Sequence, residues 1–221
     1  RNIAESMERL DKLGNVNLEI CFHLTSELLE IIKKRHYEGK NIIYSVHNVN
    51  PYYREKHLCR KGKYNTGLAD TLESSRKLAV KDMRYTLSLA QELNVTSVVI
   101  PLGKLPYSIG KRREVKLLRA VKKGEQKEAS KLRNELINLR RENIRPSLKA
   151  AIKSIDELSA QLYQTGISLV LENRVEYMKL GHQNEINKIR YLFPDIIKYC
   201  HDIGHAKVLN CLGLWGDPMK P

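Results

Sequence analysis

Three segments of the chain end an apolar run in side chains that can bind a metal ion or transfer a proton. His47 follows the apolar run at 42–46, and Glu172 follows the run at 167–171. The segment His201-Asp202-Ile203-Gly204-His205 follows the run at 196–200. Carboxylate and imidazole groups brought together from separate strands suit Mn, Zn, Mg or Co. One such residue alone would be weak grounds for a site, but three strands that converge on one rim are stronger.

The segments that must position these residues alternate between two kinds of apolar pattern. Short alternating or β-branched runs predict five strands, at 16–22, 41–47, 96–102, 167–172 and 196–201. Helical spacing predicts helices between them, at 3–13, from Thr25-Ser26 to Gly39, at 70–93, over 111–165 and at 184–191. Apolar strands separated by helices are typical of a parallel sheet that helices cover.

Two helix boundaries carry specific signals. Asp70 and Glu73 have the spacing of a capping box, which predicts the start of the third helix. The long helical region at 111–165 contains Gly124 and Pro146, so we expect at least two helices there, the second beginning near Pro146.

This order of elements predicts an α/β fold, a (β/α)8 TIM barrel that is incomplete in this chain. A closed barrel needs eight strands, whereas five are predicted, and the first strand and the last strands are absent. We expect a single partial barrel domain over residues 1–221, with a long basic helical insertion at about 111–165. Active sites of such barrels lie at the carboxyl ends of the strands, where His47, Glu172 and Asp202 fall.

The formal net charge of +14 is concentrated in the insertion. Between Lys111 and Lys149 the chain has fourteen Lys or Arg residues against five Glu. A basic helix face can attract nucleic acid or an anionic surface, although a solvated face is the more common outcome.

The composition is that of an ordinary soluble globular protein, with 42% hydrophobic and 29% charged residues. No apolar run approaches the ~20 residues that cross a bilayer, and residues 1–5 lack an apolar signal core. The four cysteines are widely spaced and form no C-x-x-C pair, which favours reduced thiols. We therefore expect a cytoplasmic protein with no membrane contact, and a homo-oligomer remains open.

Two pairs of segments resemble motifs of the xylose isomerase-like TIM-barrel superfamily. Leu171-Glu172-Asn173-Arg174 is followed about thirty residues later by His201-Asp202-Ile203-Gly204-His205-Ala206. Ser45-Val46-His47 before Pro51-Tyr52 resembles the third-strand motif of the same superfamily. That group includes sugar phosphate isomerases/epimerases and the apurinic endonucleases (family 2). The match covers nearly the whole chain, and it is more specific for the superfamily than for any substrate.

The resemblance implies roles for individual residues. Glu172 and Asp202 match metal-binding carboxylates, and Glu172 also matches a residue that transfers protons in the epimerases. His205 matches a residue that contacts substrate in the epimerases and a second metal in the endonucleases. His47 matches a rim histidine that faces metal or substrate. Arg174 occupies a substrate-binding position, where a rim salt bridge is an equal alternative.

The chain departs from the family pattern at the fourth strand. The endonucleases carry a histidine at the end of that strand, whereas this chain reads Ile100-Pro101-Leu102-Gly103. The further histidine and final acidic residue of the later strands have no counterpart after Ala206. The missing fourth-strand histidine weakens the prediction of a three-zinc endonuclease site, and the missing later residues indicate that the barrel is incomplete in this chain.

Simpler explanations exist for some of these residues. His47 could be a satisfied strand-end histidine, and Asp202 could cap the helix that follows it. Glu172 is harder to explain away, because an unpaired buried carboxylate is costly. Arg54 and Lys56, in the loop after His47, could bind a substrate phosphate or could simply be solvated. The other histidines, including His36 and His182, have no matching partners and are expected at the surface or in loops.

The function that the resemblance implies is a metal-dependent sugar or sugar-phosphate isomerase/epimerase. A divalent ion on Glu172 and Asp202 would bind the oxygens of a small-molecule sugar and stabilise the enediolate formed by proton transfer next to a carbonyl. One alternative is an apurinic endonuclease-like phosphodiesterase acting on DNA, for which nucleic-acid binding is implied. Another is a non-catalytic barrel remnant that binds partners through its basic helix.

Overall fold

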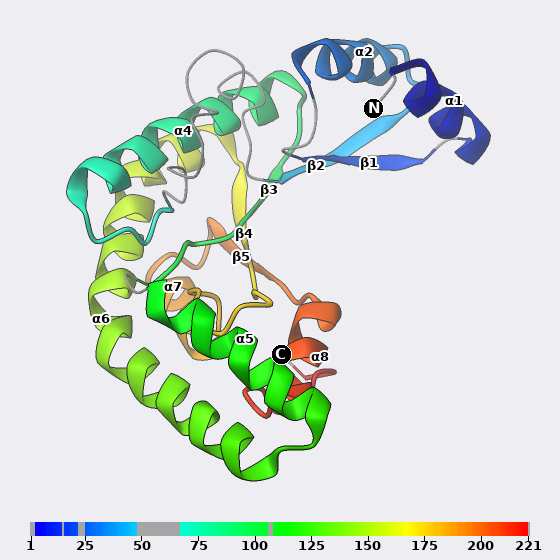
Figure 1. The fold of residues 1–221 in the computed structure, drawn as a ribbon. Helices are drawn as coiled ribbons and strands as arrows, with labels where there is room; N and C mark the ends of the chain where they lie inside the picture. Colours follow the sequence, from blue (N-terminus) through cyan, green and yellow to red (C-terminus); the bar gives the residue numbers. More distant parts are fainter. Residues whose placement is uncertain (1–2, 15, 22–24, 48–66, 106–107, 221) are drawn as a thin grey trace.

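The computed structural model describes the chain except residues 1–2, 15, 22–24, 48–66, 106–107 and 221, and shows a parallel sheet flanked by helices (Figure 1). In chain order the elements are α1 (Ile3–Leu13), β1 (Asn17–Ile20), α2 (Ser26–Tyr37), β2 (Ile42–His47), α4 (Glu73–Glu92), β3 (Ser97–Ile100), α5 (Ser108–Lys123), α6 (Gln126–Thr165), β4 (Ser168–Glu172), α7 (Gln183–Leu192), β5 (Ile197–Cys200) and α8 (Ile203–Cys211).

The strands pair in chain order, β1-β2-β3-β4-β5, and every pairing is parallel. Each strand lies in a segment where the sequence predicts one, and the predicted α/β order is confirmed. Parallel neighbours need a crossover connection, which α2, α4, α6 and α7 provide. The carboxyl ends of all five strands therefore lie along one edge of the sheet.

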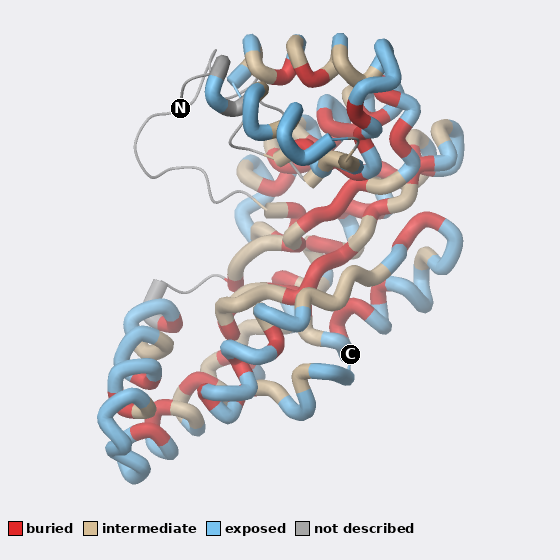
Figure 2. Tube along the Cα trace, turned by 90° about the vertical axis from the view of Figure 1, so that its right-hand side faces the viewer, coloured by how far each residue is buried: buried red, intermediate tan, exposed pale blue. Residues whose placement is uncertain are grey.

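One face of the sheet carries the apolar core. Val98, Leu169 and Ile197 are adjacent in register across β3, β4 and β5, and all three are fully buried. They share one core with Leu87 of α4 and Leu158 of α6. Burial of side chains of this size stabilises the fold by roughly 1.5–3 kcal/mol each. Figure 2 shows this buried layer running through the sheet.

The opposite face is less covered, most clearly on β2. Ile42 and Tyr44 are 57% and 70% exposed, whereas Ile43 between them is buried. Alternate residues of a strand point to opposite faces, so α2 and α4 cover only one side of β2. β2 has one extra residue opposite β1, since Leu18 pairs with Ile43 and Glu19 with Ser45, so the alternation shifts at Tyr44 and His47 lies on the same side as Ser45.

Helix α4 does not begin with the predicted capping box. Its N-cap is Leu72, which makes no side-chain cap, and Asp70 accepts a hydrogen bond from the Leu72 amide at 3.0 Å. The Glu73 carboxylate instead accepts hydrogen bonds from Arg76 at 2.7 Å and from Lys153 of α6 at 2.9 Å. Glu73 thus joins two helices, and these cations compete successfully for the carboxylate that a capping box would use.

The long helical region breaks at Gly124 but not at Pro146. Gly124 has a φ of 74°, a left-handed conformation that ends α5, whereas α6 runs without interruption through Pro146. Proline removes one helical hydrogen bond at a cost of about 3 kcal/mol. The prediction of a helix start near Pro146 is wrong because the helix is buried on both sides of it, through Arg140, Ser147 and Ala151.

His36 is a structural residue and not the surface residue that the sequence suggests. Its Nδ1 accepts a hydrogen bond from the Ile43 amide, and its Nε2 lies 3.1 Å from the Leu93 carbonyl oxygen. The ring therefore links α2, the start of β2 and the end of α4.

Two further expectations concern the chemistry of the chain as a whole. Cys21, Cys200 and Cys211 are free thiols, and Cys59 lies outside the described residues. Among the residues that the structure describes, no helix is both long and apolar enough to cross a membrane.

Asp82 of α4 is expected to make the stability of the folded protein depend on pH. Burial raises the pKa of its carboxyl from 3.8 to about 6, and its Oδ1 is buried without a hydrogen-bond partner among the described residues. Between these pH values the folded state holds more protons than the unfolded state, so stability falls as the pH rises from 3.8 to about 6. We expect Asp82→Asn to add about 1 kcal/mol at pH 8, a value reduced for partial exposure.

Thermal unfolding of both proteins at pH 4 and pH 8 measures this effect. The gain should be present at pH 8 and largely absent at pH 4, whereas the exposed Asp156→Asn should change neither melting temperature. An equal gain at both pH values would show that ionisation of Asp82 is not the cause.

Candidate functional site

The register of the sheet brings His47 and Glu172 to the same face. His47 pairs with Val99 of β3, and Val99 pairs with Val170 of β4. Glu172 lies two residues beyond Val170 and therefore points to the same side of the sheet. The two side chains meet there, with His47 Nε2 3.7 Å from Glu172 Oε2.

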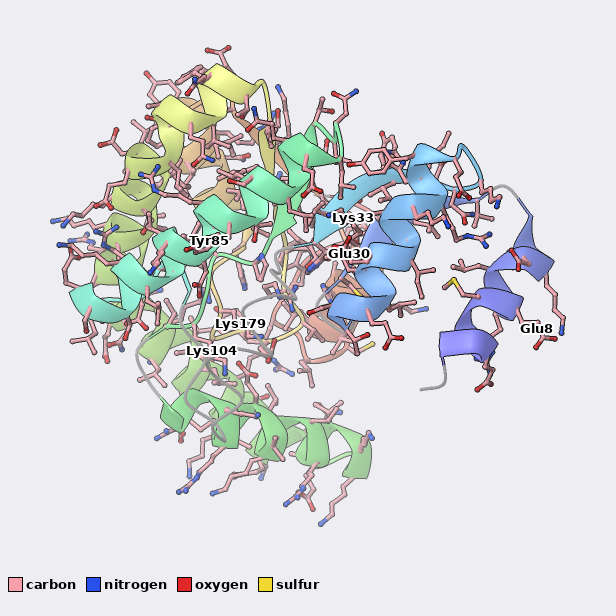
Figure 3. All side chains as sticks on the ribbon, turned by 90° about the horizontal axis from the view of Figure 1, so that it is seen from above. Glu8, Glu30, Lys33, Tyr85, Lys104 and Lys179 are labelled. Carbon is pink, nitrogen blue, oxygen red and sulfur yellow. The ribbon has the colours of Figure 1, made fainter. Side chains whose placement is uncertain are left out.

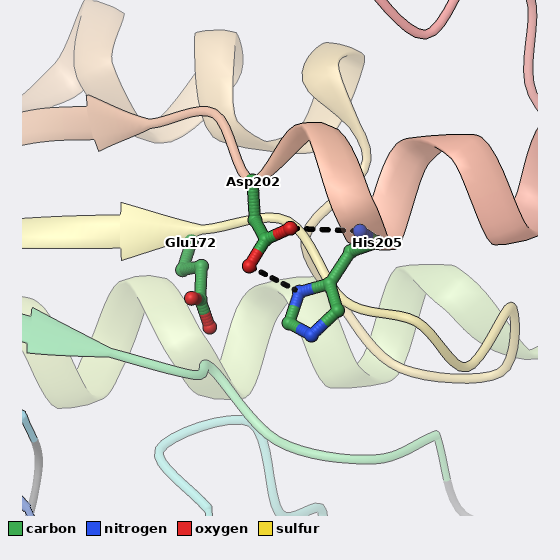
Figure 4. A group of neighbouring side chains, drawn as sticks. All are labelled: Glu172, Asp202 and His205. Carbon is green, nitrogen blue, oxygen red and sulfur yellow. Dashed lines mark hydrogen bonds and ion pairs between the residues drawn. The ribbon is translucent and has the colours of Figure 1, made fainter.

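Asp202 and His205 reach the same place from the end of β5. Cys200, the last residue of β5, pairs with Glu172, and Asp202 follows as the N-cap of α8. Asp202 Oδ1 accepts a hydrogen bond from the His205 amide at 2.7 Å, and Asp202 Oδ2 lies 3.5 Å from His205 Nδ1 (Figure 4). The capping role considered for Asp202 therefore exists, and it occupies only one carboxylate oxygen.

Glu172, Asp202 and His205 form a compact group of potential ligands. One ligand atom from each lies within 4.8 Å of the other two. Figure 4 shows Glu172 on the strand end and the other two residues across from it at the start of α8. The structure thus brings together the three residues that the resemblance marks as metal-binding.

Asn173, to which the sequence assigned no role, connects the two strand ends. Its fully buried side chain donates from Nδ2 to the Asp202 carbonyl oxygen at 2.8 Å and accepts at Oδ1 from the Asp202 amide at 2.6 Å. This pair of bonds resembles the exchange between two residues of neighbouring strands. It extends the β4–β5 connection past Cys200 and fixes the backbone of Asp202 beside Glu172.

The backbone of Asn173 also orients the His205 ring. Nδ1 of His205 lies 2.9 Å from the Asn173 carbonyl oxygen. A carbonyl oxygen only accepts, so this contact assigns the hydrogen to Nδ1 and leaves the lone pair on Nε2 of the neutral ring. A backbone carbonyl that accepts from one ring nitrogen commonly orients a metal-binding histidine in this way.

Glu172 is buried among cations. Its side chain is in contact with Arg174 and His47, both through Oε2, and the residue is 8% exposed. Burial alone would raise the pKa of Glu172, but the adjacent His47 and the charge of Arg174 outweigh it, so the pKa lies below its ordinary value. The Glu172 carboxylate in turn raises the pKa of His47 despite burial of the ring.

Arg174 makes the rim salt bridge that the sequence left as one alternative. It contacts Glu172 through Nη1, while its Nε is buried without a partner among the described residues. One nitrogen of the guanidinium therefore has a hydrogen-bond partner, and the buried Nε–H donor has none among the described residues. Its predicted role in binding substrate remains a prediction.

Gly181 allows the loop after β4 to fold back beneath Glu172. Its φ is 138°, and a Cβ on this residue would lie 2.9 Å from the Glu172 carbonyl oxygen. The Gly181 amide donates to Glu185 Oε2 at 2.9 Å, and Glu185 in turn is paired with Arg140 of α6. The long insertion helix therefore braces the loop that leaves the site.

His182 and His201 do not belong to the group. His182 is packed between the rings of Tyr177 and Trp215, and burial together with the charge of Arg140 lowers its pKa to about 3. His182 lies in the loop after β4, as the sequence allows, but its ring is enclosed there and helps to hold that loop. His201 contacts the Tyr199 hydroxyl and the Pro218 carbonyl oxygen, each at 2.8 Å.

The basic loop after His47 cannot be compared with its prediction. Arg54 and Lys56, the proposed phosphate-binding residues, lie outside the described residues. The end of β3, Ile100-Pro101-Leu102-Gly103, contributes no metal-binding side chain, as the sequence indicates.

Comparison with known proteins identifies the fold. No family model and no curated protein sequence matches the chain. Among solved structures, a D-tagatose 3-epimerase-like protein matches with a TM-score of 0.54 and 18% identity over 90% of this chain. The 3-keto-D-glucoside 4-epimerase from E. coli matches with 0.56 and 15% over 98%, and a D-psicose 3-epimerase with 0.57 and 12% over 98%.

The chain therefore has the fold of the xylose isomerase-like TIM barrels, and the predicted resemblance is confirmed at the level of fold. It spans 63%, 72% and 66% of the lengths of these three proteins. This agrees with the predicted incomplete barrel, since the described residues contain five parallel strands where a closed barrel has eight. Identities this low define the fold and leave the activity to be argued from the site.

Replacement of Asn173 tests whether its side chain holds the two strand ends together. Asn173→Ala leaves the Asp202 amide without its partner and removes one of the two hydrogen bonds to the Asp202 carbonyl oxygen, which also accepts from the Ala206 amide, so we expect it to lower the free energy of unfolding by about 1–3 kcal/mol. Chemical denaturation measures this change. Asn138→Ala, at an exposed position of α6, is the matched control and should stay within about 0.5 kcal/mol of the parent. Similar small losses in both variants would show that the Asn173 bonds do not hold the strand ends.

Proposed function

We propose that the protein is a metal-dependent isomerase or epimerase of a sugar or sugar phosphate, with Glu172, Asp202 and His205 as its metal-binding residues. The observation that carries the proposal is the convergence of these three side chains at the carboxyl edge of a parallel sheet. The solved structures of similar fold include three sugar epimerases or epimerase-like proteins, which supports this reaction class.

The three residues fit a divalent cation because each keeps a donor atom available. Both cations that contact Glu172 use Oε2, which leaves Oε1 without a hydrogen bond from any described residue. Asp202 uses Oδ1 for its cap and keeps Oδ2, and His205 keeps Nε2. Two carboxylate oxygens and an imidazole nitrogen are a donor set that Mn, Zn, Mg or Co accepts.

The bound ion would act as a Lewis acid on the substrate oxygens. Glu172 would move the proton at the carbon next to the carbonyl, because it is ionised and buried at the strand end. His47, at the end of β2, would donate a hydrogen bond to a substrate oxygen. Arg174 would use its unsatisfied Nε in the same way, and Arg54 and Lys56 would meet a phosphate if the substrate carries one.

The sugar reaction is favoured over DNA cleavage by two observations. The similar structures include sugar epimerases, and β3 ends without the histidine that the endonuclease site requires. The barrel-remnant alternative shares the fold and differs in having no metal, so metal binding separates it from the enzyme.

Metal affinity tests the proposed ligands. We expect Mn²⁺ to bind with one-to-one stoichiometry in calorimetric titration, and Glu172→Gln and Asp202→Asn each to weaken binding at least tenfold, because each removes a charged oxygen donor. Asp195→Asn, an exposed carboxylate in the turn before β5, is the matched control and should bind as the parent does. If neither Glu172→Gln nor Asp202→Asn weakened Mn²⁺ binding, the ion would bind elsewhere.

Proton transfer tests the reaction itself. A panel of ketoses and their phosphates incubated in D₂O with the Mn²⁺-loaded protein should gain deuterium at the carbon next to the carbonyl, as mass spectrometry would detect. Glu172→Gln should abolish this exchange. A protein that binds Mn²⁺ at these residues but exchanges no proton in any of these sugars would contradict the isomerase or epimerase assignment.

A further inference from the structure

The solvent face of α5 is uniformly basic. Eight residues of this helix between Gly110 and Lys123 are exposed, and six of them are cations: Lys111, Arg112, Lys116, Arg119, Lys122 and Lys123. The other two exposed residues are Val115 and Leu118. The only acidic residue of the helix, Glu114, is turned inward, where its carboxylate accepts a hydrogen bond from the Met178 amide at 2.7 Å.

Helix geometry gathers these cations on one side. At 3.6 residues per turn, the six positions fall within an arc of about 140°, and they extend over about 18 Å of the helix axis. The opposite side, with Leu117 and Ala120 fully or nearly buried, packs against α6. Figure 3 shows nitrogen-tipped side chains projecting from α5 away from the rest of the molecule.

Most of these cations have no ion-pair partner among the described residues. Among the described residues, only Lys123 of the six forms an ion pair, a long one of 3.8 Å with Glu125. Like charges three or four residues apart destabilise a helix, and Arg112, Lys116 and Arg119 stand in that relation. A polyanion that binds along this face would relieve the repulsion.

The outward face of the first half of α6 is also basic, although the exposed Glu128 and Glu142 border it. Lys127, Lys131, Arg141 and Arg145 are exposed and lie within one narrow arc, with the neutral Asn134 and Asn138 between them. The two helices form a hairpin that turns at Gly124 and projects beyond the sheet, with exposed residues on its outside (Figures 1 and 2). The two helices therefore present positive charge on opposite outer sides of the hairpin, and the denser of the two faces is that of α5.

We propose that this helical hairpin binds the phosphate backbone of a nucleic acid without regard to base sequence. The match is one of charge spacing, because one strand of a duplex presents a phosphate per about 3.4 Å of helix axis and α5 carries a cation per about 3 Å. An anionic membrane fits less well, since an interfacial helix needs a broad apolar face to insert. Here the apolar face of α5 packs against α6. The two apolar residues on its outer side, Val115 and Leu118, are only 41% and 40% exposed. The proposal is independent of the chemistry at Glu172.

The salt dependence of binding to a 20-base-pair DNA duplex of random sequence tests the proposal. We expect the logarithm of the binding constant to fall with the logarithm of salt concentration with a slope of about −5. The triple variant Lys111→Gln, Arg119→Gln, Lys122→Gln should make the slope less steep by about 3 and weaken binding at least tenfold at 100 mM salt. Fluorescence anisotropy measures both quantities.

A control of equal net charge separates a defined surface from general attraction. Lys77→Gln, Lys188→Gln, Lys207→Gln removes three exposed lysines from α4, α7 and α8 and should leave the slope unchanged. Circular dichroism melting checks that both variants are folded. Equal losses in the two triple variants would overturn the proposal, and so would binding of the parent to phosphatidylserine vesicles with no binding to the duplex.

Discussion

The reciprocal hydrogen bonds between the Asn173 side chain and the Asp202 backbone hold the candidate site together. Parallel pairing fixes β4 and β5 only as far as Glu172 and Cys200. Beyond that point the two segments diverge, because β4 is followed by a loop and β5 is followed by α8. The Asn173 amide bridges them at 2.6 and 2.8 Å and thereby sets Asp202 beside Glu172. Its carbonyl oxygen then orients His205, so one buried residue positions two of the three potential ligands.

The electrostatics of the group follow from that arrangement. Three side chains that can bear charge lie together at the edge of a sheet, and burial of an isolated Glu172 would favour its neutral form. Arg174 and His47 supply positive charge on one side of Glu172 and keep it ionised. Both contacts use Oε2 and leave Oε1 without a hydrogen bond from any described residue. Each of the three residues is thus anchored through one atom and available through another, which is the arrangement expected of a preorganised cation site.

The sequence alone was enough to predict the five strands and the polar residues at their carboxyl ends. Short apolar runs located all five strands because parallel strands are buried on at least one face and tolerate few polar residues. Glu172 and Asp202 stood out for the same reason, as charges placed where those runs stop. Asn173 could not be recognised as a connector, because its partner is a backbone group twenty-nine residues away.

Other features depended equally on distant contacts. Glu73 looked like a capping residue until Lys153 and Arg76 were placed beside it, and Pro146 looked like a helix boundary until packing on either side was known. His182 looked like a surface residue because the rings that enclose it come from the loop after β4 and from beyond α8. Local patterns identify which residues are unusual, and tertiary contacts decide what they do.

Anomalous diffraction from crystals soaked in Mn²⁺ tests the central claim most directly. The account predicts one strong anomalous peak at coordination distance, about 2.0–2.3 Å, from oxygens of Glu172 and Asp202 and from Nε2 of His205. Strong peaks only at other positions, with Glu172 still held by Arg174 and His47 alone, would contradict it.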